Sequence, residues 1–400
     1  MKNLKLNSLF ICFLILTCIS CRKDFFIEPS IAPTEFSAEF PFEFVDGLIV
    51  LKVEIRGQLY DFVLESGALT LVSKEVAQEL GLKAEFSRRF DGSQKGKTKI
   101  DFLTLDKLNI AGVDFQETNI GIMDFSPINE TSCFNFDGFI GPSLMQNAVW
   151  EIDYQNQVIK MTRNADAMDI PSNAEKIAFE VNNLMQPRTT VNINGQPETV
   201  KIDLGSSGGI NIKVTQNTYD QLKDSSDKTV IEGFGRYSRA ISGYGDPLST
   251  KFARSNQVSI GNLINNDEIV LFKTNGSSTI GNQFFKNYRV ILNWFEKEMI
   301  LIPNLDPPTN DLQNFGFRPI FKDNKPAIGF IYTNSSAAKV GLDINDEIIA
   351  INGIAIQNRS KSDWCAVKNE LDNTLQNSLS ITIRRNGKNM EFTLEKMDLI

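Results

Sequence analysis

Histidine is absent from the 400 residues of this chain. Its absence excludes Ser-His-Asp and Cys-His catalysis, zinc sites that need imidazole, and any histidine acting as a general base. Basic residues do not dominate either: the net charge is −8 and the isoelectric point is near 5.0. We therefore do not expect nucleic acid as a partner, and any catalysis must use other side chains.

Cysteine is scarce, and beyond the first 21 residues only Cys133 and Cys365 remain. They lie in segments that we assign below to different domains. Isolated cysteines are more often small buried apolar groups than halves of a bridge. We therefore expect two separate thiols and a fold that does not depend on disulfides.

The N-terminal residues have the pattern of an export signal. Lys2 and Lys5 precede an apolar run, Leu9 to Ile19, that is too short to span a bilayer as a mature helix. The run ends Cys18-Ile19-Ser20-Cys21, which resembles a bacterial lipoprotein signal. The resemblance implies a lipid on Cys21 and attachment to a membrane surface of the cell envelope. An ordinary signal peptide, cleaved nearby, is the alternative.

Two similar stretches in the chain each carry an apolar strand up to one carboxylate and then a glycine. They are Phe62-Val63-Leu64-Glu65-Ser66-Gly67 and Val200-Lys201-Ile202-Asp203-Leu204-Gly205. The acids stand the same distance after the predicted hairpin turns at Arg56-Gly57 and Asn194-Gly195. Short capped helices follow both, the first with Ser73 as its cap and the second over Val214 to Leu222 with Thr215 as its cap. Such spacing predicts a duplicated β unit rather than a short solenoid repeat.

Paired carboxylates at the base of a cleft can share one proton. At close range both do not ionise readily, so one stays neutral and acts as an acid while the other acts as a base on water. This arrangement hydrolyses an amide without a metal, a cofactor or a covalent intermediate, and we expect none of these in this chain.

Residues 42–303 resemble the aspartic proteases of the pepsin and retropepsin type. The resemblance is carried by Glu65-Ser66-Gly67, by Asp203-Leu204-Gly205, and by the apolar motifs that end at Gly141 and Gly281. It implies a mainly β, two-lobed acid-protease fold, with lobes at 42–165 and 166–303. The implied catalytic residues are Glu65 and Asp203, and the implied structural residues around them are Ser66, Gly67, Gly205, Gly141 and Gly281.

The same resemblance implies that a polypeptide substrate lies extended in the cleft beneath flexible hairpins. Residues 84–100 suit the first hairpin, and Tyr237 and Tyr244 are candidates for the second. Residues 22–41, which have no sustained period, are expected to be a tether from the signal peptide at 1–21.

Each acid loop departs from the Asp-Thr-Gly or Asp-Ser-Gly pattern of the family. Glu65 carries one extra methylene, which displaces its carboxylate by about 1.5 Å, and Leu204 replaces a hydroxyl residue. The resemblance gives that hydroxyl a hydrogen bond between the loops, which here only Ser66 can make. Two hypotheses follow: an active endopeptidase, or a catalytically degenerate relative that binds polypeptides without cleaving them.

Residues 314–397 follow a linker at 304–313 and resemble a PDZ domain. The most specific part of the resemblance is the run from Ser335 to Gly353, and we expect a helix over Ser362 to Leu371. The resemblance implies that a polypeptide C-terminus binds at the loop Phe315-Gly316-Phe317 and adds a strand beside the helix. The alternative is a packing module that binds nothing.

Overall fold

The computed structural model describes residues 29–91, 97–214, 230–241, 243–305, 312–356 and 360–400. The described chain is mainly β, as expected. The signal region with Cys21, and the predicted helix with Thr215, lie outside the described residues apart from Val214.

The first β unit is a nine-stranded sheet, counted over the described ranges, in which the strand leading to Glu65 lies between two others. Its strands are β1 (Ser30–Ala32), β3 (Glu43–Val45), β4 (Leu48–Ile55), β5 (Gln58–Leu64), β6 (Leu71–Ser73), β7 (Phe86–Asp91), β8 (Lys97–Ile110), β9 (Val113–Met123) and β10 (Gly138–Ile140). The predicted turn between β4 and β5 is confirmed. Arg56 and Gly57 have positive φ angles of 54° and 83°, as a tight hairpin turn requires.

Short helices connect these strands: α1 (Lys74–Glu79), α2 (Ser126–Thr131) and α3 (Pro142–Met145). The predicted cap of α1 is confirmed, because the Ser73 hydroxyl accepts a hydrogen bond from the Val76 N–H at 3.1 Å. Gly81, just beyond the helix end, has a positive φ of 62°.

The second β unit belongs to a sheet in which the described residues form 16 strands. Its own strands there are β14 (Glu180–Val181), β15 (Pro187–Ile193), β16 (Gln196–Ile202), β17 (Ile210–Lys213), β18 (Val230–Gly235), β21 (Leu248–Ser255), β22 (Val258–Ile260), β23 (Leu263–Asn265), β24 (Glu268–Lys273) and β25 (Thr279–Ile280). A small hairpin, β19 (Arg239–Ala240) and β20 (Gly243–Tyr244), stands apart from it. Asn194 and Gly195 form the predicted turn between β15 and β16, with φ angles of 49° and 82°.

The strand pairings around the two acid loops are the same. In the first unit β10 runs parallel to β5 and antiparallel to β6, and β6 runs parallel to β9. In the second unit β25 runs parallel to β16 and antiparallel to β17, and β17 runs parallel to β24. The repeat in the sequence is therefore also a repeat in the topology.

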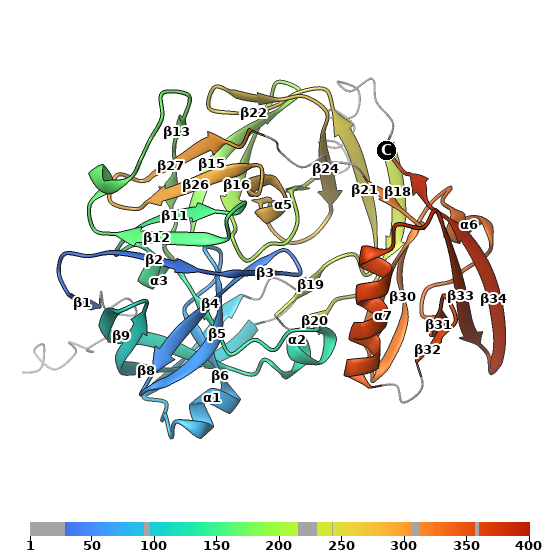
Figure 1. Ribbon diagram of the computed structural model, residues 1–400, viewed down its shortest axis with the longest axis horizontal. Helices are drawn as coiled ribbons and strands as arrows, with labels where there is room; N and C mark the ends of the chain where they lie inside the picture. The colour runs from blue at the N-terminus through green and yellow to red at the C-terminus, as the bar shows by residue number, and fades with distance from the viewer. Residues whose placement is uncertain (1–28, 92–96, 215–229, 242, 306–311, 357–359) are drawn as a thin grey trace, which may run out of the picture.

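A third sheet, six-stranded over the part of the chain that the structure describes, joins the two β units (Figure 1). Its order is β13 (Glu175–Ala178), β27 (Glu298–Pro303), β26 (Tyr288–Asn293), β11 (Val149–Asp153), β12 (Val158–Thr162) and β2 (Ser37–Pro41). The expected tether at 22–41 is wrong in its second half, because β1 pairs with β9 and β2 pairs with β12. Alternating half-buried side chains in β2 show why this short segment adds to the sheet.

The third unit continues the 16-stranded sheet, since its strand β30 (Lys325–Tyr332) pairs with β18. It has a core of its own that includes Trp364, Ile328 and Ile381. The helix predicted over Ser362 to Leu371 is confirmed as α7 (Lys361–Asn373), with Ser360 as its cap. The other elements are β28 (Gln313–Asn314), β29 (Phe317–Lys322), α6 (Ser336–Lys339), β31 (Glu347–Ile351), β32 (Ile354–Ala355), β33 (Ser378–Arg385), β34 (Lys388–Glu395) and β35 (Met397–Asp398).

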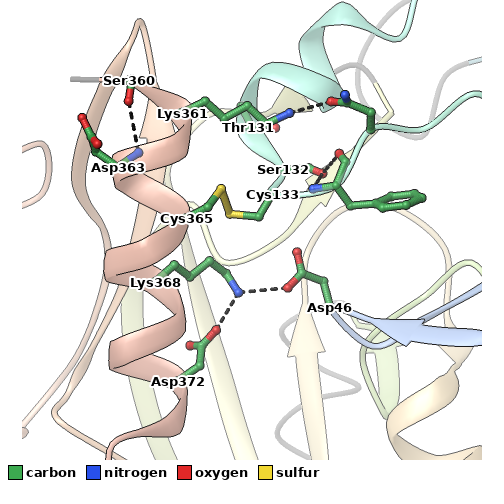
Figure 2. The surroundings of a disulfide bond; sticks show 12 residues. Asp46, Thr131, Ser132, Cys133, Ser360, Lys361, Asp363, Cys365, Lys368 and Asp372 are labelled. Carbon is green, nitrogen blue, oxygen red and sulfur yellow. Dashed lines mark hydrogen bonds and ion pairs between the residues drawn. A yellow bond between two sulfur atoms is a disulfide. The ribbon is translucent and has the colours of Figure 1, made fainter. Parts of the chain in front are cut away.

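The expectation of two separate thiols is wrong, because Cys133 and Cys365 form a disulfide with their Cα atoms 5.4 Å apart. Cys133 follows α2 in the first β unit, and Cys365 lies in α7 of the third unit (Figure 2). Helix α2 lies against β29, which brings the two segments together in space. Beside the bridge, Lys368 pairs with Asp46 at 2.9 Å. The error arose because docking between distant units leaves no local pattern in the sequence.

Candidate active site

Glu65 and Asp203 follow directly after β5 and β16, at matching positions of the two β units. The Glu65 N–H donates to the Ile140 carbonyl at 2.9 Å, and the Asp203 N–H donates to the Ile280 carbonyl at the same distance. Each acid is thus held by the short parallel strand of its own unit. Asp203 is 8% exposed, and Glu65 is partly buried.

Gly67 and Gly205 each lie against the acid of the opposite loop. A Cβ atom on Gly205 would stand 1.7 Å from Glu65 Oε2, and one on Gly67 would stand 2.7 Å from Asp203 Oδ1. Real Cβ atoms do not approach so closely, so a side chain at either position would force the facing acid to move. Each acid therefore reaches across to the other loop, and the two carboxyl groups are neighbours.

Ser66 links the two acid loops. Its hydroxyl donates to the Ile202 carbonyl at 2.8 Å and accepts from the Leu204 N–H at 2.9 Å, and the residue is fully buried. Leu204 occupies the matching position of the second loop, where its side chain is buried in the core. The hydroxyl contact between the loops is consequently made from the first loop.

Gly141 and Gly281 support the acid loops from behind. A Cβ on Gly141 would stand 2.5 Å from the Thr70 nitrogen, and one on Gly281 would stand 2.5 Å from the Ser206 carbonyl oxygen. The Gly141 N–H also donates to the Thr70 hydroxyl at 3.0 Å. Both glycines thus allow the turn that follows β10 or β25 to pack closely on the loop of its own unit.

Burial raises the pKa of the Glu65 carboxyl well above its ordinary value of 4.5, and the neighbouring Asp203 raises it further. Two contacts oppose the shift: the charge of Lys201, and the Gly67 N–H, which donates to Glu65 Oε1 at 2.6 Å. The net effect favours a neutral Glu65. This carboxyl can therefore hold the proton that an acid pair shares.

Lys201 belongs to the site and did not feature among the sequence-based candidates. Its ammonium lies 2.9 Å from Asp203 Oδ2 and donates to the Gly67 carbonyl at 3.2 Å. Burial acts to lower the pKa of Lys201, but the carboxylates of Asp203 and Glu65 outweigh it and raise the pKa. The period of two in strand β16 places Lys201 and Asp203 on one face, which is a signal that the sequence does contain.

Asn282 is a second buried polar residue that sequence reasoning missed. Its side-chain NH₂ donates to the carbonyls of Leu204 at 2.7 Å and Gly47 at 2.8 Å, and its oxygen accepts from the Tyr154 hydroxyl at 2.8 Å. It opens α5 (Asn282–Phe285) and ties the second acid loop to the first β unit. Pro142 stands at the matching position of the first unit, so the repeat gave no indication of this role.

The structure contains the first of the two hairpins expected over the cleft, and it places the two tyrosine candidates for the second hairpin in different surroundings. Residues 86–110 form the hairpin of β7 and β8, while its tip at 92–96 lies outside the described residues. Tyr237 packs edge-on against Phe252 and Phe330, and the Arg318 guanidinium lies 4.3 Å from the centre of its ring. Tyr237 is therefore held at the junction with the third unit. Tyr244 lies in β20 of the small hairpin.

The expected carboxylate-binding loop of the third unit is already engaged within the chain. Phe315 and Phe317 are buried in the core of that unit, at 4% and 5% exposure. The Gly316 N–H donates to the Asn314 side-chain oxygen at 2.7 Å. A peptide carboxylate at this N–H would have to displace Asn314.

In the ranges that the structure describes, no group of three or more cysteine, aspartate and glutamate side chains is placed to hold a metal ion. No helix in those ranges is long and apolar enough to cross a membrane.

Residues 51–144 match the model of a family described as aspartyl protease, so the segment with Glu65 and Gly141 is aspartic-protease-like. The match ends before the second acid loop. Among 397 matching chains of solved structures is a retropepsin-like aspartic protease from Rickettsia conorii. It is 18% identical, with a TM-score of 0.26, and the match covers 32% of this chain and 93% of that chain. No curated protein matches.

Proposed function

We propose that this chain is an aspartic-type endopeptidase in which Glu65 and Asp203 activate a water molecule against a peptide bond. In this proposal the two β units are the lobes of a pepsin-like fold, with the polypeptide substrate between them. The observation that carries the proposal is the reach of each acid to the glycine of the opposite loop. The aspartyl protease match over residues 51–144 supports the same class of reaction.

The chemistry follows from the different surroundings of the acids. Neutral Glu65 donates its proton toward the carbonyl oxygen of the peptide, while the Asp203 carboxylate takes a proton from water as the oxygen of that water attacks the carbonyl carbon. As the tetrahedral intermediate collapses and the C–N bond breaks, protonated Asp203 gives its proton to the leaving nitrogen. A hydroxyl of the intermediate returns a proton to Glu65, so both acids regain their starting states. Water is the only co-reactant.

The test is cleavage of an unfolded protein from about pH 3 to about pH 8, the span in which the carboxyl groups titrate. The wild type is expected to cleave, and Asp203→Asn and Glu65→Gln are expected to be inert. Equal cleavage by the wild type and Asp203→Asn would contradict the proposal. If the wild type and Asp203→Asn are both inert while Glu65→Asp cleaves, the site can still support catalysis and the activity was lost through the glutamate at position 65.

A second candidate is a catalytically degenerate protein that binds polypeptides without cleaving them. Three features favour it: the extra methylene of Glu65, the buried Leu204, and the ion pair that Lys201 makes with Asp203, the base of the first proposal. It predicts that peptide affinity, measured by fluorescence anisotropy, is the same in the wild type and in Asp203→Asn. Any turnover that depends on Asp203 would eliminate this candidate.

We further propose that the third unit is PDZ-like and binds substrate through the edge of β29 beside α7. The run from Ser335 to Gly353 supports this, whereas the position of α2 against β29 opposes it. Peptides with a free C-terminus are expected to bind the full chain more tightly than the same peptides with an amidated end. Equal binding would instead favour a packing module.

Export and lipid attachment at Cys21 are also proposed, from the motif Cys18-Ile19-Ser20-Cys21. Labelling with a fatty acid in a bacterial host is expected to mark the wild type and Cys18→Ser but not Cys21→Ser. Labelling of all three would show that the lipid is attached elsewhere, and labelling of none would favour an ordinary signal peptide.

A further inference from the structure

Lys201 is a buried cation placed directly on the acid pair. Its side chain is 17% exposed, that of Asp203 is 11% exposed, and their charged atoms are 2.9 Å apart. The strand neighbours Val200 and Ile202 are fully buried in the hydrophobic core, so Lys201 and Asp203 share the other face of β16. This placement is built into the strand and is not a chance contact of a surface side chain.

The first β unit has no equivalent cation. The residue that stands in the same relation to Glu65 is Val63, which is fully buried. Among the described residues, the acid pair therefore has an ammonium in ion-pair contact with Asp203, whereas the position that corresponds to Lys201 beside Glu65 is apolar. The topology is duplicated, but the charge around the two acids is not.

The charged groups that face Asp203 come from several elements. Lys201 contacts it from its own strand, Glu65 faces it from the end of β5, and Lys273 of β24 interacts with it at longer range. Arg188 of β15 adds positive charge near Lys201. An opposite charge in contact stabilises the ionised form of a carboxyl, and a second carboxyl nearby must then remain neutral.

We propose that Lys201 is a positioning residue that holds the negative charge of the acid pair on Asp203 and the shared proton on Glu65. The proposal rests on the proposed function, because it assigns the base to Asp203 and the acid to Glu65 in that reaction. Lys201 also donates to the Gly67 carbonyl, so the same side chain ties the base to the backbone of the acid's loop. Lys201 thus determines which of the two carboxyl groups carries the charge and which carries the proton.

The experiment compares the pH dependence of kcat/KM for the wild type, Lys201→Met and Lys201→Arg. Without the cation the negative charge on Asp203 loses its contact with an ammonium, so the acid limb of the profile is expected to move toward higher pH in Lys201→Met. Lys201→Arg is expected to keep the wild-type limb. Lys176→Met, which removes the exposed Lys176–Glu298 pair, is the matched control and should not move it. A Lys201→Met limb that coincides with that of the wild type overturns the proposal.

A second measurement separates this proposal from the proposed function. The ¹³C shifts of the Glu65 and Asp203 carboxyl carbons are followed with pH, and the signals are assigned from Glu65→Gln and Asp203→Asn. In the wild type the Glu65 signal is expected to report a neutral carboxyl well above pH 4.5. In Lys201→Met or Lys201→Gln the shared proton is expected to be distributed over both signals. These titrations need no turnover, so an inert enzyme would contradict the proposed function alone. Protonation of Asp203 before Glu65 in the wild type would overturn the role of Lys201, even if neither neutral variant folds.

Discussion

Gly205 lies directly against the carboxyl group of Glu65, so that any side chain on Gly205 would occupy the space of Glu65 Oε2. We expect Gly205→Ala to displace the Glu65 carboxyl and lower kcat/KM by about 10²-fold or more, because a shift of about 1 Å is enough for such a loss. Steady-state cleavage of an unfolded protein measures the effect.

Gly209 provides the matched control for this substitution. A Cβ there would meet Gln283 at 3.8 Å, which is an ordinary contact. Gly209→Ala is therefore expected to retain activity. Comparable losses in the two variants would show that alanine is harmful in this loop for reasons unrelated to Glu65.

Loss of the Ser66 hydroxyl should affect both stability and activity. Ser66→Ala leaves the buried Leu204 N–H without its acceptor, which costs about 1–3 kcal/mol. The midpoint of urea unfolding should fall accordingly, and cleavage should fall because the two acid loops lose their link. Ser255→Ala is the control, since Ser255 is a buried serine that donates to Asn194 at 2.8 Å away from the acids. It is expected to lower stability without lowering cleavage per folded molecule.

The sequence allowed prediction of those features that depend on local pattern. The hairpin turns at Gly57 and Gly195 and the cap at Ser73 follow from backbone preferences, and the two acids follow from the repeat. The turns and the cap agree with the structure because neighbouring residues determine them. The need for glycine at 205 is different, since it comes from an approach between loops that are distant in the sequence.

Two of the features that sequence reasoning missed, the Asn282 contacts and the disulfide, join parts of the chain that are far apart. Asn282 was missed because the duplicated position carries a proline, so the comparison of the repeats suggested no polar role there. Lys201 was missed because alternation along its strand was used to find the core and not the charges on the opposite face. The Cys133–Cys365 bridge depends on how α2 docks against the third unit, for which there was no local signal.

The protonation of Glu65 should make stability depend on pH. The pKa of Glu65 in the folded chain is raised above its ordinary value of 4.5. The protonated group therefore contributes its whole stabilisation of the fold below pH 4.5, and this stabilisation is lost as the pH rises through the raised pKa. Glu65→Gln mimics the neutral form. We expect urea midpoints of the wild type to fall, relative to Glu65→Gln, as the pH rises above about 4.5.

Asp124 gives a control of opposite sign. The hydrogen bonds from the Ser126 hydroxyl at 2.6 Å and N–H at 3.0 Å lower the pKa of Asp124 from its ordinary 3.8. The contribution of ionised Asp124 to the stability of the fold is present above pH 3.8 and is lost as the pH falls through the lowered pKa. Asp124→Asn should therefore alter the profile only on the acid side. A Glu65→Gln profile parallel to that of the wild type between about pH 4 and pH 8 would mean that Glu65 is not buried as a neutral acid.

The disulfide between Cys133 and Cys365 closes a chain separation of 232 residues, so its removal should be costly. In Cys133→Ser/Cys365→Ser the free energy of unfolding is expected to fall by about 2–5 kcal/mol, which would lower the midpoint of thermal or urea unfolding. A reducing agent should lower the midpoint of the wild type similarly and leave that of the double variant unchanged. An equal effect of the reductant on both proteins would point to something other than this bridge.

The same double variant tests whether the first β unit covers the edge of β29. With the bridge removed, the segment that follows α2 is held to α7 by weaker contacts, among them the hydrogen bond from Lys361 to Asn135 at 2.7 Å. If this edge is the peptide site, the affinity for peptides with a free C-terminus should rise in Cys133→Ser/Cys365→Ser. Lys368→Met is the control, because it removes the pair with Asp46, worth about 0–1 kcal/mol, but leaves the covalent link. Unchanged affinity in the double variant, despite its lower stability, would mean that the third unit is a packing module.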